Sequence, residues 1–131
     1  MLHLGQTDTA PNEAEKLIDQ NIQIGLSITD ENQLGNISNC VNYLGVGPIF
    51  PTGSKSDASE PMGLNTLKKI IYKTKLPVVA IGGISLDNIS DLFKIGVSGV
   101  AVISAILNEY NPTENFHKLK ENIIKGLEKW I

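Results

Sequence analysis

Short apolar segments alternate with amphipathic segments along the whole chain, and this alternation limits the fold more than any other feature. "VVAI" at 78–81 and "GVAVI" at 99–103 are near-continuous apolar runs of strand length. Such runs are typical of parallel strands buried on both faces, because a half-exposed strand would alternate apolar with polar residues. Their alternation with helix-length segments predicts an α/β fold with right-handed parallel crossovers.

The pattern predicts about five β/α units, counted by their apolar runs. At 131 residues the chain is long enough for one hydrophobic core, so we expect a single domain over 1–131. Thr29 and Asp30 are expected to cap the second helix, and Ser85 the fourth. The expected strands lie within 1–4, 22–27, 42–50, 78–83 and 98–104, and the expected helices within 13–20, 29–40, 63–74, 86–96 and 113–130.

Composition excludes several classes of protein. With 11 basic and 14 acidic residues, the chain lacks the positive charge expected of a nucleic-acid binder. No apolar run approaches the ~20 residues that span a bilayer, and the N-terminus lacks the pattern of a signal peptide. Cys40 is the single cysteine, so no internal disulfide is possible and a cytoplasmic location is expected. We interpret Cys40 as a packing residue, and His3 and His117 as structural.

The loops that follow parallel strands emerge on one side of the sheet, where α/β proteins bind ligands. "VGPIFPTGSKSD" at 46–57 places Thr52, Ser54 and Lys55 directly after a strand. By default such a lysine is a solvated charge, and the cluster favours a binding role. The loops at Gly82-Gly83 and Ile103-Ser104 favour a phosphate site, because glycine and free amides admit an anion closely. The alternative is that the glycines only form a tight turn.

Several segments, taken together, resemble the thiamine phosphate synthase family, specifically the C-terminal part of its barrel. The resemblance implies a (β/α)8 TIM-barrel type of fold. Family members join hydroxymethylpyrimidine diphosphate to thiazole phosphate and release pyrophosphate with the help of Mg²⁺. The matching segments are "HLGQTD" (3–8), "IGLS" (24–27), "YLGVGPIFPTGSKSDA" (43–58), "GL" (63–64), "PVVAIGGI" (77–84) and "GVAVISAI" (99–106).

The resemblance also implies roles for individual residues. Asp8 would be a Mg²⁺ ligand, although an isolated carboxylate at this place could equally cap a helix. Ser27 and Lys55 would be catalytic as well as substrate-binding, on the pyrimidine diphosphate side. Thr52, Ser54 and Lys55 would hold the diphosphate, although the family often has threonine where Ser54 stands. The thiazole phosphate site would contain Gly83, Ile103 and Ser104.

One departure from the family concerns the start of the barrel. Full members begin with about three further strand–helix units, which complete the barrel of eight. We therefore expect an incomplete barrel, arising from an internal start, a fragment or a split gene, and acting as a homo-oligomer or with a complementing N-terminal fragment. Two other functions stay open, namely a thiazole tautomerase-like protein and a non-catalytic phosphate-binding remnant. The tautomerases carry a histidine shortly after the strand matching "IGLS", where this chain has "SITDEN".

Overall fold

The strands of the computed structural model, which describes residues 1–53, 60–107 and 111–130, form one parallel sheet. The five strands lie in sequential order, β1-β2-β3-β4-β5. Every neighbouring pair is parallel, so crossovers join consecutive strands, and the predicted α/β organisation is confirmed. The strands are β1 Leu2–Leu4, β2 Ile24–Ile28, β3 Val41–Val46, β4 Val78–Ile81 and β5 Gly99–Ala101.

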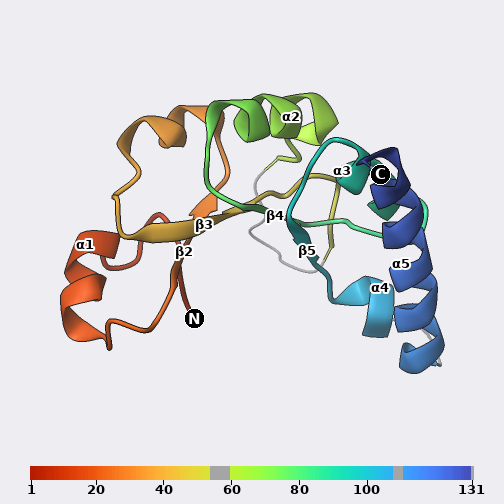
Figure 1. The fold of residues 1–131 in the computed structure, drawn as a ribbon, viewed down its shortest axis with the longest axis horizontal. Helices are drawn as coiled ribbons and strands as arrows, with labels where there is room; N and C mark the ends of the chain where they lie inside the picture. Colours follow the sequence, from red (N-terminus) through yellow and green to blue (C-terminus); the bar gives the residue numbers. More distant parts are fainter. Residues whose placement is uncertain (54–59, 108–110, 131) are drawn as a thin grey trace.

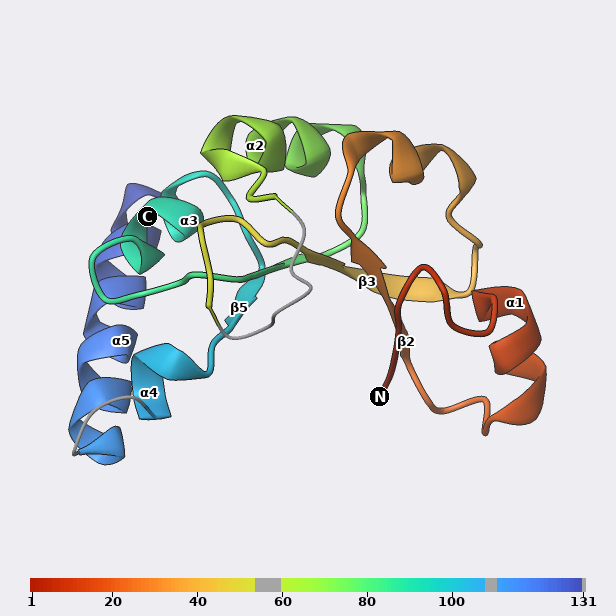
Figure 2. The same cartoon turned by 180° about the vertical axis from the view of Figure 1, so that it is seen from behind.

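The helices lie on one side of this sheet. Figures 1 and 2 show an arch in which the strands form the inner layer, while α2, α3 and α5 cover the outer side. A curved parallel sheet in sequential order, with helices on the outside only, is the wall of a (β/α)8 barrel. The helices are α1 Pro11–Ala14, α2 Gly63–Lys73, α3 Ile89–Lys94, α4 Ser104–Leu107 and α5 Pro112–Leu127, with 3₁₀ segments η1 Glu15–Leu17, η2 Glu31–Asn36 and η3 Glu128–Trp130.

The hydrophobic core lies between the sheet and the outer helices. Because side chains alternate along a strand, the residues between the core positions face the hollow of the arch. Those inner positions include Gly25, Ser27, Tyr43 and Gly45, which are smaller or more polar than the core residues. The side chains with no exposed surface come from both layers: Ile28, Leu44, Val46 and Ala80 from the strands, and Leu67, Ile70, Ile89 and Leu92 from the helices.

The segment from 29 to 40 is not the helix that we predicted. It contains only the 3₁₀ segment η2, whose N-cap Asp30 forms a capping box with Gln33. Gly35 and Asn36 are poor helix formers, and Ile37 already has the extended conformation, so the turn cannot continue as an α-helix. Cys40 therefore lies in the turn before β3, half-buried against the core.

The long C-terminal helix α5 agrees with its prediction. Its N-terminus begins at Pro112, where the side chain of Asn111 accepts a hydrogen bond from the amide of Glu114 at 3.1 Å. Near its other end, Gly126 lets α5 approach α3 closely, because a Cβ there would lie 2.6 Å from the carbonyl oxygen of Ser90.

Among the described residues, no helix is both long enough and apolar enough to cross a membrane.

Candidate functional site

Backbone hydrogen bonds join the loop after β3 to the loop after β4. The amide of Ile49 donates to the carbonyl of Ile81 at 3.0 Å, and the amide of Phe50 donates to the carbonyl of Gly82 at 3.1 Å. These bonds continue the parallel pairing past the ends of the regular strands. The segment that contains Thr52 is thereby held alongside the glycine pair.

Gly82 and Gly83 allow the two loops to approach each other. Their φ values are 95° and 64°, which other residues rarely adopt. A Cβ on Gly82 would lie 2.6 Å from the Cβ of Pro48, and a Cβ on Gly83 would lie 2.4 Å from the carbonyl oxygen of Pro51. The glycines therefore do more than form a tight turn, since they provide the space into which the preceding loop packs.

An open cleft of about 760 Å³ lies between these loops and the loop after β5. Thr52, Gly83, Ile103 and Ser104 all line it. Ile103 is 65% exposed, so its side chain is accessible from solvent. The structure thus brings together, from three separate loops, all the expected substrate-binding residues that it describes except Ser27.

Helix α3 begins later than we expected. Its N-cap is Asn88, not Ser85. The amide of Ser85 donates to Oδ1 of Asn88 at 2.9 Å, and Nδ2 of Asn88 donates to the carbonyl of Gly83 at 3.0 Å. The amide of Ser85 is therefore engaged within the loop, and a phosphate at this cleft would depend on the glycine loop and on Ser104.

Two predicted residues of the diphosphate loop, Ser54 and Lys55, lie outside the described residues. The structure describes the chain up to Gly53 and again from Glu60. Their predicted roles therefore stay predictions, and of the three residues only Thr52 is placed, at the cleft.

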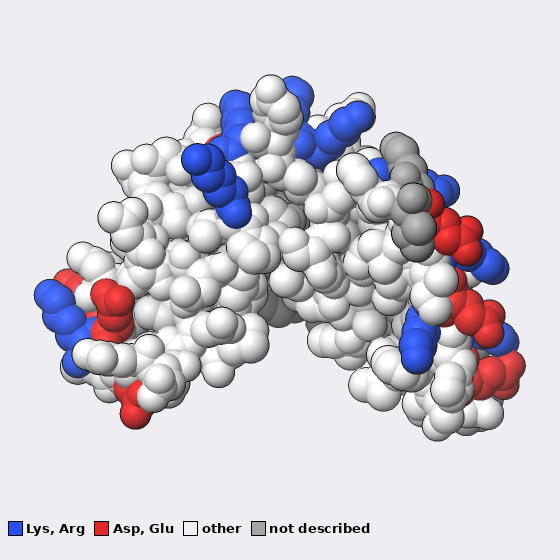
Figure 3. Space-filling model, in the orientation of Figure 1, with Lys and Arg blue, Asp and Glu red and all other residues white. Residues whose placement is uncertain are grey.

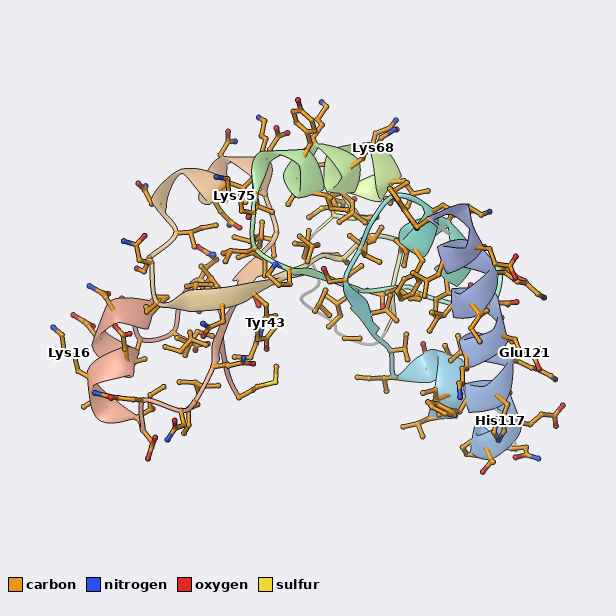
Figure 4. The ribbon with its side chains drawn as sticks, in the orientation of Figure 1. Lys16, Tyr43, Lys68, Lys75, His117 and Glu121 are labelled. Carbon is orange, nitrogen blue, oxygen red and sulfur yellow. The ribbon has the colours of Figure 1, made fainter. Side chains whose placement is uncertain are left out.

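A second group of polar side chains lies on the inner face of the sheet. Nε2 of His3 is 2.8 Å from Oγ of Ser27, and Nδ1 of His3 is 2.9 Å from the hydroxyl of Tyr43. The three residues come from β1, β2 and β3. Figure 4 shows Tyr43 on the inner side of the arch and His117 on the outer helix α5. Ser27 was predicted as a site residue, whereas His3 was interpreted as structural and Tyr43 was not singled out.

Glycine explains how side chains from non-adjacent strands meet here. His3 pairs in register with Gly25, which in turn pairs with Tyr43. A Cβ on Gly25 would lie 2.1 Å from Cζ of Tyr43, and a Cβ on Gly45 would lie 2.7 Å from Cε1 of His3. The two rings therefore lie over the backbone of Gly25 and Gly45, where no side chain intervenes, and their centroids are 5.5 Å apart. The sequence contains the three segments "HL", "IGLS" and "YLG" in consecutive strands. Only the register between the strands shows that their side chains meet.

Asp8 stabilises the loop that follows β1. Its carboxylate accepts a hydrogen bond from the amide of Gly5 at 2.6 Å, and the residue is exposed. Ala10 is the N-cap of α1, so Asp8 is not a helix cap. In the same loop, Nε2 of Gln6 donates to the carbonyl of Ser27 at 2.6 Å, which ties the loop to β2. Within residues 1–53, 60–107 and 111–130, no group of three or more His, Cys, Asp or Glu is placed to hold a metal ion.

The inner face carries little charge. Figure 3 shows charged side chains over the outer helices and both ends of the arch, whereas other residues line the hollow in that view. Although His3 is exposed as a residue, partial desolvation of its ring lowers the pKa below the ordinary 6.5, and the carboxylate of Asp8 opposes this in part. The imidazole of His3 is therefore neutral at pH 7, with one ring nitrogen as donor and the other as acceptor.

Comparison with known proteins identifies relatives over most of the chain. The family model described as thiamine monophosphate synthase matches residues 1–106. The thiamine-phosphate synthase of Lactococcus lactis subsp. lactis (strain IL1403) is 42% identical over 123 residues, covering 93% of this chain and 57% of the relative. That of Staphylococcus carnosus (strain TM300) is 48% identical over 122 residues, covering 89% and 56%.

A solved structure agrees with the sequence relatives. The thiamine phosphate pyrophosphorylase from Pyrococcus furiosus superposes with a TM-score of 0.80 at 34% identity, covering 95% of this chain and 59% of that protein. The chain thus spans somewhat more than half the length of the relatives that it matches. Family model, relatives and structure agree, and the chain belongs to the thiamine monophosphate synthase family.

Proposed function

We propose that this chain takes part in thiamine phosphate synthesis, a transfer that joins hydroxymethylpyrimidine diphosphate to thiazole phosphate and releases pyrophosphate. One observation carries the proposal: Thr52, Gly83, Ile103 and Ser104 line a single cleft at the carboxyl end of the sheet. Family membership indicates which substrates to consider there. The open cleft of about 760 Å³ is within the range that small-molecule sites occupy.

The proposed roles divide the cleft between two anionic groups. Gly83, Ile103 and Ser104 bind the thiazole phosphate through backbone and hydroxyl donors. Thr52, together with Ser54 and Lys55 of the adjoining loop, binds the diphosphate. Loss of pyrophosphate leaves an electron-poor pyrimidine methylene carbon and a strongly anionic leaving group. The ammonium of Lys55 and the hydroxyl donors stabilise the negative charge that develops on that group.

Asp8 is the proposed protein ligand for Mg²⁺. A single carboxylate suits this ion when substrate phosphates complete its coordination, since Mg²⁺ is usually held by one or two carboxylates plus phosphate oxygens and water. Asp8 is exposed in the loop after β1, and its carboxylate accepts a hydrogen bond from the amide of Gly5. The ion, when bound, would neutralise part of the charge of the diphosphate.

The edges of the sheet indicate a partner. In the described chain, β1 and β5 each pair with a strand on one side only. Every strand of a closed barrel has two neighbours, and an open edge readily recruits another strand. We propose that an N-terminal synthase segment completes these edges and is required for turnover. Light scattering with and without such a segment tests this, and a symmetric dimer that is active alone would replace the proposal with a homo-oligomer.

Calorimetry with each substrate tests the proposed function. We expect the chain to bind thiazole phosphate, and to bind the pyrimidine diphosphate in the presence of Mg²⁺. Ser104→Ala should weaken thiazole phosphate binding about tenfold, because a hydrogen bond to a charged group is lost. Ser38→Ala, in the turn before β3, is the matched control and should change neither affinity.

A second variant tests the diphosphate side. Lys55→Ala should weaken binding of the pyrimidine diphosphate and, in a complemented enzyme, lower kcat by about 10²- to 10³-fold. Binding of thiazole phosphate alone would favour a non-catalytic remnant. Failure to bind either substrate would contradict the assignment of the cleft.

A further inference from the structure

His3 links two hydroxyl groups in a chain of hydrogen bonds, and among the described residues no other side chain is hydrogen-bonded to Oγ of Ser27. Tyr43 contacts Nδ1 of His3 at 2.9 Å, and Ser27 contacts Nε2 at 2.8 Å. Ser27 is half-buried, and its own carbonyl is engaged by Gln6. A serine hydroxyl can donate one hydrogen bond and accept two, so the direction of the His3 contact decides what Ser27 can offer to a ligand.

Chemical differences between the two hydroxyls determine that direction. A neutral imidazole carries one N–H, so one nitrogen of His3 donates and the other accepts. The phenol of Tyr43 is more acidic than the aliphatic hydroxyl of Ser27, and it is therefore the stronger donor. Tyr43 accordingly donates to Nδ1, and the N–H stays on Nε2, where it donates to Oγ of Ser27. With its oxygen already accepting from the imidazole, Ser27 keeps its own hydrogen available.

We propose that Tyr43 and His3 are positioning residues that fix Ser27 as a hydrogen-bond donor toward the hollow of the arch. The ligand group that receives the hydrogen of Ser27 is then an acceptor, such as a phosphate oxygen or a ring nitrogen. This inference rests on the proposed function for the identity of the ligand. The hydrogen-bond relay from Tyr43 through His3 to Ser27 rests on the two contacts of His3 and on the chemistry of the hydroxyls.

The glycines beneath the two rings indicate that the rings orient Ser27 and do not simply fill space. Gly25 and Gly45 leave room for the rings of Tyr43 and His3 directly against the backbone. Both rings lie on the inner face, outside the hydrophobic core between sheet and helices. Tyr43 is half-buried and His3 is exposed, so burial of the rings contributes little compared with the core side chains. Their specific contribution is the orientation of Ser27.

The tautomer of His3 tests the relay without any ligand. The chain has two histidines, so ¹⁵N NMR spectra of the imidazoles can be assigned with a single variant, His117→Asn. At about pH 8, where imidazole is neutral, we expect His3 to carry its hydrogen on Nε2. Tyr43→Phe keeps the ring over Gly25 and removes the hydroxyl, and it should shift His3 toward the Nδ1–H tautomer.

Tyr72→Phe is the matched control, because Tyr72 is 91% exposed on the outer helix α2. It should leave the His3 spectrum unchanged. A wild-type His3 with its hydrogen on Nδ1 would overturn the relay. So would a spectrum that does not respond to Tyr43→Phe.

A double-mutant cycle connects the relay with binding. With the pyrimidine diphosphate and Mg²⁺, Ser27→Ala should weaken binding about five- to tenfold, the loss of one hydrogen bond. Tyr43→Phe should weaken binding by less, and it should have no further effect when Ser27→Ala is already present. Additive effects would contradict a role through Ser27. If the wild-type chain does not bind this ligand, the proposed function fails, while the tautomer of His3 still decides the relay.

Discussion

The two polar regions of this protein are built in different ways. On the inner face of β1 to β3, side chains hold one another: His3 contacts both Ser27 and Tyr43 above the backbone of Gly25 and Gly45. In the cleft after β3 to β5, the backbone forms the framework, because loop amides and carbonyls pair and glycines at positive φ admit the neighbouring loop.

This difference predicts how each region responds to change. A backbone-built cleft depends on the path of its loops, so an added methyl group disturbs the fold as well as the ligand site. A side-chain network on an open face can rearrange without unfolding, because its members are exposed or half-buried. Substitutions in the network on the inner face should therefore reduce function while stability is kept, and substitutions in the cleft should reduce both.

Substitution at Gly83 should have the largest effect on stability. Gly83→Ala places a Cβ at φ 64°, about 2.4 Å from the carbonyl oxygen of Pro51. Strain and overpacking together should lower the free energy of unfolding by about 2 to 4 kcal/mol, measured by urea denaturation. In Gly35→Ala, the control, the new Cβ meets nothing within 4 Å, and the free energy of unfolding should not fall by more than about 0.5 kcal/mol. Equal stabilities for the two variants would contradict the view that the cleft depends on close backbone packing at Gly83.

Substitution at Gly45 should affect binding more than stability. The new Cβ of Gly45→Ala would lie 2.7 Å from Cε1 of His3, whose exposed ring can move away. We expect about 1 kcal/mol of destabilisation, with a loss of about tenfold in affinity for the pyrimidine diphosphate measured by calorimetry.

Gly99→Ala is the matched control for Gly45→Ala. Gly99 and Gly45 both pair in register with Val79, and a Cβ on Gly99 would make only an ordinary contact, 3.7 Å from Cγ2 of Val79. Affinity and stability should both be unchanged. If Gly99→Ala weakens binding as much as Gly45→Ala, the network on the inner face is not the cause.

The smallest expected effect concerns the pKa of His3. Burial lowers this pKa, and the carboxylate of Asp8 raises it in part. Asp8→Asn removes the opposing charge, so an NMR titration should show the pKa of His3 moving further down. The folded state then favours neutral His3 more strongly than the unfolded chain does. Stability associated with His3 should therefore be complete above about pH 6.5 and decline as pH falls toward the folded pKa. An upward shift in Asp8→Asn would contradict the arrangement.

Much of the fold and the cleft was predictable from local patterns. The apolar runs at 78–81 and 99–103 indicate parallel strands, and the structure has β4 and β5 there. Once the strands are parallel, the loops that follow them must share one end of the sheet, which brought Thr52 and Ser104 to one cleft. The helix expected at 29–40 was wrong because the capping residues Thr29 and Asp30 indicate where a helical turn starts, but not that Gly35 and Asn36 end it early.

The order of the elements and the parallel pairing of the strands follow from local sequence patterns, because strand and helix periods are visible within a few residues. The contact between His3 and Tyr43, which are 40 residues apart along the chain, arises only when the strands assemble into the sheet. That contact depends on the pairing of three strands, on an irregularity in register between Ile24 and Gly25, and on the absence of a side chain at Gly25. A shift of one residue would turn these side chains to the other face, so no local pattern can predict the network.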